Sequence, residues 1–138
     1  IPCDGFYFWK NFSKKEKTPY YFQYTKEKLI YCVGIRETFQ DFSGNSFKYF
    51  YFLTDQSTEK WKKFTPKIPI LFDIRYLDIW FSKTTSINKI SSFIKPIKFD
   101  DFNFYTVSPY FENNNRDDIS LINPSNNLNQ YGNYSLFD

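Results

Sequence analysis

Aspartate and glutamate are the residues of this 138-residue chain that could most readily bind a metal ion or transfer a proton, because the chain contains no histidine. Asp73 and Asp78 lie in one apolar run, and residues 100–101 and 117–118 are adjacent aspartate pairs. Paired carboxylates can bind magnesium or calcium, or act as general acid and base. Adjacent acids are more often solvated loop charges, and without histidine the Ser–His and Cys–His nucleophile pairs are excluded. We therefore expect a protein that is not an enzyme, with no catalytic residue and no cofactor.

Lysines lie among aromatic residues in two places. One is residues 60–64 (KWKKF), and the other is Lys10 with residues 14–17, beside the aromatic run at residues 6–12 (FYFWKNF). Such a patch could hold phosphates through lysine and stack nucleic-acid bases on tryptophan, or lie on a membrane surface. The alternative is a chance mixture in an aromatic-rich chain. The candidate patch comprises Lys14, Lys15, Lys17, Lys60, Trp61, Lys62 and Lys63.

Cys3 and Cys32 are the only two cysteines. In an oxidising compartment they could form a disulfide, which would stabilise the fold by about 3 kcal/mol on the chain-entropy model. The alternative is two reduced thiols, with Cys32 buried in a strand. A zinc site is not expected, because the chain has neither histidine nor a Cys-x-x-Cys motif.

The longest run dense in apolar residues is residues 67–81 (KIPILFDIRYLDIWF). Prolines at its start favour extended backbone, and alternation predicts a strand over residues 70–77, with a turn into a helix as the alternative at its end. Asp73 and Arg75 then share one face and can form an ion pair.

Further elements are predicted from period-two patterns, turn residues and caps. They are a strand or partner-anchoring segment at 6–12, a hairpin joining 20–25 to 28–35, a loop at 39–45, a strand at 47–53, a short helix at 57–64, a weak helix at 84–95 and an edge strand at 103–107.

These elements predict an α+β fold, mainly antiparallel β-sheet with one or two short helices and a long extended C-terminal arm. Residues 1–111 would form one β-rich domain and residues 112–138 an Asn-rich arm, which is too polar to fold alone. Its candidate partner-anchoring residues are Tyr131, Tyr134, Leu136 and Phe137. The net charge of +3 combines a basic body with an acidic C-terminal region, which suits two different partners.

Residue usage is far from average: 24% of residues are aromatic, and methionine and histidine are absent. In this usage the chain resembles the highly diverged proteins encoded by AT-rich ciliate mitochondrial genomes, although it matches no family motif. The resemblance implies a mitochondrial protein, on the matrix side or associated with the inner membrane, that belongs to a respiratory complex, the ATP synthase or the mitochondrial ribosome.

The function expected from these observations is a non-catalytic accessory subunit of a respiratory-chain or ATP-synthase complex, bound to several protein subunits and peripheral to the membrane. No apolar run is long enough to cross a bilayer. One alternative is a mitochondrial ribosomal protein that binds rRNA through its basic body. A second alternative is a secreted, disulfide-containing, β-rich binding protein.

Overall fold

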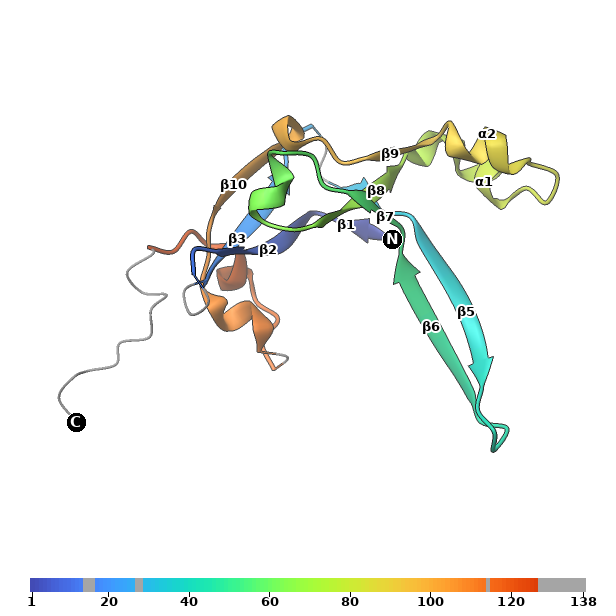
Figure 1. Cartoon of the computed structure of the whole chain (residues 1–138), viewed down its shortest axis with the longest axis horizontal. Helices are drawn as coiled ribbons and strands as arrows, with labels where there is room; N and C mark the ends of the chain where they lie inside the picture. Colours follow the sequence, from blue (N-terminus) through green and yellow to red (C-terminus); the bar gives the residue numbers. More distant parts are fainter. Residues whose placement is uncertain (14–16, 27–28, 114, 127–138) are drawn as a thin grey trace.

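The computed structural model describes residues 1–13, 17–26, 29–113 and 115–126. Its antiparallel strands form a twisted body from which a long hairpin projects, and two short helices lie at one end (Figure 1). The strands are β1 (Pro2–Cys3), β2 (Gly5–Asn11), β3 (Lys17–Tyr24), β4 (Ile30–Tyr31), β5 (Gly34–Gln40), β6 (Ser46–Phe52), β7 (Thr54–Gln56), β8 (Lys67–Phe72), β9 (Ile94–Pro96) and β10 (Phe102–Thr106).

The core forms on a three-stranded sheet in the order β10–β3–β2. Its central strand carries Phe22, which is fully buried, and its neighbours add further aromatic side chains. Trp61, on the 3-10 helix η1 (Trp61–Lys63), packs on this sheet with its ring centroid 4.9 Å from that of Phe22. Ile30, Ile68, Ile97 and Phe102 complete the buried cluster. The high aromatic content therefore fills this core with tilted and edge-on ring pairs, the geometry that such rings prefer.

A second sheet, β7–β8–β9, is joined to the small β1–β4 pair through contacts between β4 and β8. Cys32 bridges to Leu71 of β8, and the Val33 amide donates a 2.9 Å hydrogen bond to the Ile70 carbonyl. The β8 strand is thus the link between the N-terminal segment and the helical end of the molecule.

The β5–β6 hairpin projects from the body (Figure 1). Its strands pair with each other from Gly34 opposite Phe52 to Gln40 opposite Ser46. The turn is closed by Asp41, which accepts hydrogen bonds from the Ser43 and Asn45 amides, and by Gly44 at φ +82°. Large side chains on both of its faces are exposed, including Phe39, Phe47, Phe50 and Phe52.

The helical elements are short. They are the 3-10 helices η1, η2 (Ile74–Tyr76), η3 (Phe99–Asp101), η4 (Pro109–Glu112) and η5 (Ile119–Ile122), and the α-helices α1 (Leu77–Phe81) and α2 (Ile87–Ser91). The fold-class prediction, α+β with mainly antiparallel sheet and few short helices, is confirmed. Among the described residues no helix is long and apolar enough to cross a membrane.

Several predicted elements need correction. The hairpin joining residues 20–25 to 28–35 is wrong, because β3 pairs with β2 and β10 while β4 pairs with β1. The predicted loop at 39–45 begins inside β5, whose partner is the correctly predicted strand near 47–53. The strand predicted over 70–77 ends at Phe72, because the Asp73 side chain accepts the Arg75 amide and starts η2. The predicted helices at 57–64 and 84–95 shorten to η1 and α2.

Beyond residue 112 the described chain folds back onto the sheet. Val107 bridges to Pro124, the Ser125 amide donates to the Thr106 carbonyl at 2.9 Å, and Leu121 is buried. The Tyr105 hydroxyl also donates to the Ile122 carbonyl. The predicted anchors Tyr131, Tyr134, Leu136 and Phe137 lie outside the described residues.

Candidate functional site

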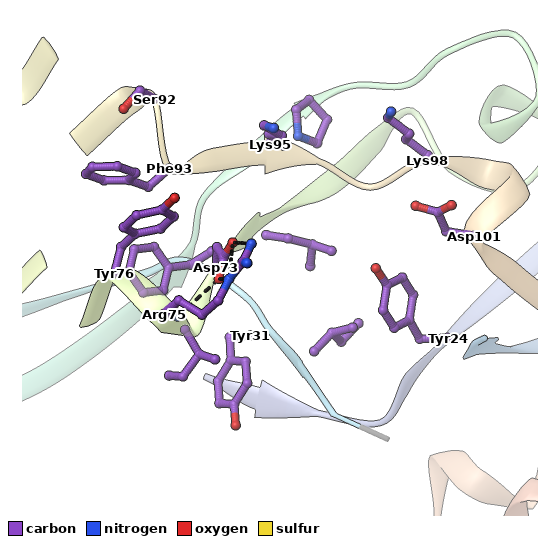
Figure 2. Close-up of a pocket in the computed structure, with 15 residues that line it drawn as sticks. Tyr24, Tyr31, Asp73, Arg75, Tyr76, Ser92, Phe93, Lys95, Lys98 and Asp101 are labelled. Atoms are coloured by element: carbon purple, nitrogen blue, oxygen red, sulfur yellow. Dashed lines mark hydrogen bonds and ion pairs between the residues drawn. The ribbon is translucent and has the colours of Figure 1, made fainter. Parts of the chain in front are cut away.

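A cleft of about 600 Å³ lies between β4, the end of β8 with η2, and the segment from Ser92 to Asp101 (Figure 2). Its lining includes the apolar side chains of Ile30, Leu71 and Phe72. Charged side chains and tyrosines stand around it. Three segments far apart in the sequence therefore build one site.

Asp73 and Arg75 form an ion pair in the cleft. The Arg75 Nε donates to Asp73 Oδ1 at 2.9 Å, and Nη2 lies 2.5 Å from Oδ2. This fork geometry follows from the start of η2, where Asp73 Oδ1 also accepts the Arg75 backbone amide at 3.1 Å. The hydrogen bonds from Arg75, together with the positive charge of Lys95, hold the pKa of Asp73 below its usual range. The pair stays charged at neutral pH, and the Arg75 side chain is 79% exposed.

Two lysines add positive charge to the same cleft. Lys95 stands opposite Leu71 in the β8–β9 ladder, and Lys98 follows β9. In the part of the chain that the structure describes, neither lysine has a salt-bridge partner, whereas Asp101 is neutralised by Lys26 at 2.6 Å. The cleft therefore presents more available positive than negative charge.

Aromatic side chains flank these charges. Tyr76 stacks on Phe93 with ring centroids 4.2 Å apart and an interplanar angle of 19°. Tyr24 and Tyr31 also line the cleft (Figure 2). All four side chains are only partly buried.

Cations beside partly exposed aromatic rings suit a ligand that carries anionic oxygens and flat or apolar groups. A metal site has less support, since in the described residues no three His, Cys, Asp or Glu side chains gather closely enough to hold an ion. The cations and aromatic rings around the cleft therefore make it a candidate binding site.

The sequence-predicted patch is not brought together as one ligand surface. Trp61 is fully buried in the core, so its ring cannot stack on a nucleic-acid base. Lys60 pairs with Asp100 and Lys62 with Glu59, while Lys63 is exposed. Lys17 lies elsewhere, 4.0 Å over the Trp9 ring. Lys14 and Lys15 lie outside the described residues.

The predicted cysteine pair does come together: Cys3 and Cys32 are free thiols whose Sγ atoms lie 3.6 Å apart. The cleft residues Lys95, Lys98, Tyr76 and Phe93 were missed by sequence reasoning. The only available signal was the Asp73–Arg75 spacing, because the other contributors come from segments that only the tertiary fold unites.

Comparison with known proteins decides the family. Residues 1–114 match the family described as SOS response associated peptidase (SRAP). The chain belongs to the SRAP family. It is 24% identical over 129 residues to the abasic site processing protein YoaM of Bacillus subtilis, a match that covers 93% of this chain and 57% of YoaM.

Two crystal structures share the SRAP chain's fold. A protein from Bacteroides thetaiotaomicron superposes with a TM-score of 0.72 at 18% identity, covering 91% of this chain and 56% of that one. A protein from Bordetella bronchiseptica superposes with a TM-score of 0.60 at 13% identity, covering 78% and 53%. The chain thus spans little more than half the length of the proteins it matches.

These matches correct the functional predictions. The resemblance to ciliate mitochondrial proteins was wrong, because a bacterial SRAP relative aligns over nearly the whole chain. A mitochondrial location, a respiratory or ATP-synthase subunit, a ribosomal protein bound to rRNA and a secreted binding protein are all unsupported for a SRAP chain. The expectation of a non-enzyme also conflicts with a family described as a peptidase.

Proposed function

We propose that this SRAP chain contributes a DNA-binding surface to a protein that processes abasic sites, and that the cleft around Arg75, Lys95 and Lys98 receives the DNA. The observation that supports this proposal is the position of three cations and four partly exposed aromatic rings around one cleft. The relative YoaM, named for abasic site processing, supplies the substrate class.

The charges match what a DNA backbone requires. Lys95 and Lys98 have no ion-pair partner within the described chain and could each neutralise a phosphate. Arg75 is held in place by Asp73, so its exposed guanidinium edge needs little ordering on binding. The two lysines would neutralise phosphate charge, and Arg75 would fix the orientation of the bound DNA strand.

The aromatic rings explain how the cleft could distinguish damaged from intact DNA. Where a base is missing, the strand presents an apolar sugar face and neighbouring bases without a stacking partner. Tyr24, Tyr31 and the Tyr76–Phe93 pair offer rings against which such groups can pack. We assign this recognition role to the rings, and the processing reaction to the protein as a whole, since the chain spans 57% of YoaM.

Fluorescence anisotropy with two single-stranded oligonucleotides tests the proposal, one intact and one carrying a tetrahydrofuran abasic analogue. We expect tighter binding to the abasic strand. The variant Lys95→Glu should weaken binding to both strands on the order of tenfold, because one phosphate contact becomes a repulsion. Lys48→Glu, on the remote hairpin strand β6, is the matched control.

Two results would contradict the proposal. One is equal weakening by Lys48→Glu and by the cleft variant, which would show a general charge effect. The other is equal affinity for the two strands, which would remove the assignment of lesion recognition to this cleft.

A further inference from the structure

Cys3 and Cys32 lie on neighbouring strands at the junction of β1 with β4. Cys3 stands opposite Ile30 in the antiparallel ladder, which continues past β4 as Cys32 exchanges hydrogen bonds of 2.8 Å with Ile1 in both directions. The two cysteines are therefore diagonal neighbours, and their Sγ atoms lie 3.6 Å apart. The fold therefore brings the two ends of the segment from residue 3 to residue 32 together without a disulfide bond.

Little movement would join the two sulfur atoms. A disulfide bond is about 2.05 Å long, so the sulfurs must approach by roughly 1.5 Å, a displacement within reach of side-chain rotation. The backbone around them is held by the β1–β4 ladder and by the Cys32–Leu71 bridge. The sheet thus holds the two thiols close together even when no disulfide bond joins them.

The two thiols have different surroundings. Cys3 is partly exposed, whereas Cys32 is buried at 2% exposure. A hydrogen bond from the Cys32 thiol holds the pKa of Cys3 below its usual range, and the same contact together with burial raises the pKa of Cys32. Cys3 is therefore the thiol that an oxidant reaches and that ionises first, because the thiolate is the reactive form.

We propose that Cys3 and Cys32 form a redox-active dithiol that hydroperoxides convert to an intramolecular disulfide. The Cys3 thiolate attacks the peroxide, taking one oxygen to become a sulfenic acid, and the peroxide's other oxygen leaves as water after protonation. The Cys32 thiol then attacks the Cys3 sulfur, the S–S bond forms, and a second water leaves. Two thiols lose two electrons and two protons, and one hydrogen peroxide becomes two waters.

A Cys3–Cys32 disulfide would link β1 covalently to the segment that follows β4, next to residues that line the cleft. Ile30, opposite Cys3, and Leu71, bridged to Cys32, both line that cleft. Oxidation should therefore stabilise this junction.

Hydrogen peroxide applied to the purified chain tests the proposal. The expected product is a monomer lighter by about 2 Da, with a Cys3–Cys32 peptide link and a melting temperature higher by about 10 °C on the chain-entropy model. Reduction with dithiothreitol should reverse both changes. Two thiols that stay reduced, or only disulfide-linked dimers, would overturn the proposal.

Single variants separate the two roles. In Cys32→Ser, and in Cys32→Ala should the serine variant fold poorly, a dimedone adduct should accumulate on Cys3 because no resolving thiol remains. In Cys3→Ser, Cys32 should resist peroxide because its side chain is buried at 2% exposure. A dimedone adduct on Cys32 but not on Cys3 would contradict the assigned order of attack.

Discussion

At the residue scale, Asp73 shows how one side chain can decide local structure and site geometry together. Its carboxylate ends β8 by accepting the Arg75 amide, and the same carboxylate positions the Arg75 guanidinium at the cleft. Alternation predicted that the two residues would pair, and they do, but in a cap and not on a strand face. The capping preference of aspartate is the signal that would have corrected this prediction.

The depressed pKa of Asp73 predicts how its contribution to stability depends on pH. A group whose pKa is lower in the folded state stabilises the fold above its unfolded value of about 3.9 and loses that contribution as pH falls through the folded pKa. Asp73→Asn should therefore lower the urea midpoint at pH 7, and the difference from wild type should shrink below about pH 5. A difference that is constant between pH 7 and the lowest pH at which both proteins fold would contradict this account.

Trp61 gives the sharpest prediction for stability. Trp61→Ala should cost about 3–5 kcal/mol, because the side chain is fully buried among aromatic rings. Within the described structure its indole N–H is buried without an acceptor, so Trp61→Phe removes an unpaired donor and should cost much less. Urea unfolding measures both, with Lys62→Ala on the same 3-10 helix as a near-neutral control. Equal losses in the two tryptophan variants would contradict the expectation that a phenylalanine ring retains most of the packing.

At the element scale, the sequence predicted which segments form strands better than it predicted their partners. The strands at 6–12, 47–53 and 103–107 could be predicted because a segment rich in aromatic residues is recognised from the local sequence alone. The pairing of β3 with β2 and β10 depends on contacts between segments remote in sequence, which local turn chemistry at residues 26–27 cannot reveal. The cleft escaped prediction for the same reason.

The β5–β6 hairpin is predicted to be the least stable large element of the isolated chain. In the described part of the chain its strands pair only with each other, and nearly all of their side chains are exposed. A two-stranded hairpin alone is marginal in water. Amides of β5 and β6 should exchange with deuterium through a local opening, at lower free energy than those of β3.

Gly44→Ala sharpens this test, because Gly44 has φ +82°, which a side chain disfavours by about 1 kcal/mol or more. Exchange in β5 and β6 should become faster, while exchange in β3 should not change. If the variant changes exchange equally in β3, the hairpin is not an independent unit.

At the scale of the whole molecule, composition was a poor guide to ancestry. Aromatic residues are so frequent that the chain resembled proteins of AT-rich mitochondrial genomes, yet the SRAP profile matches residues 1–114. The same aromatic residues fill an ordinary core around Phe22 and Trp61. Biased residue usage is therefore compatible with a family fold, because core packing tolerates substitutions that preserve volume and apolar pattern.

The charge distribution of the whole molecule makes a final prediction about DNA binding. If Lys95 and Lys98 each displace one counterion, the logarithm of the association constant should fall with the logarithm of salt concentration at a slope of roughly −1.4 on single-stranded DNA. Lys95→Gln should make that slope shallower by about 0.7, because one phosphate contact is lost, while Lys48→Gln should leave it unchanged. The net charge of +3 is shared with surfaces remote from the cleft, so a slope that depends on total charge alone would change equally in both variants. Anisotropy titrations across a salt series distinguish these outcomes, since the local model requires the two glutamine variants to differ.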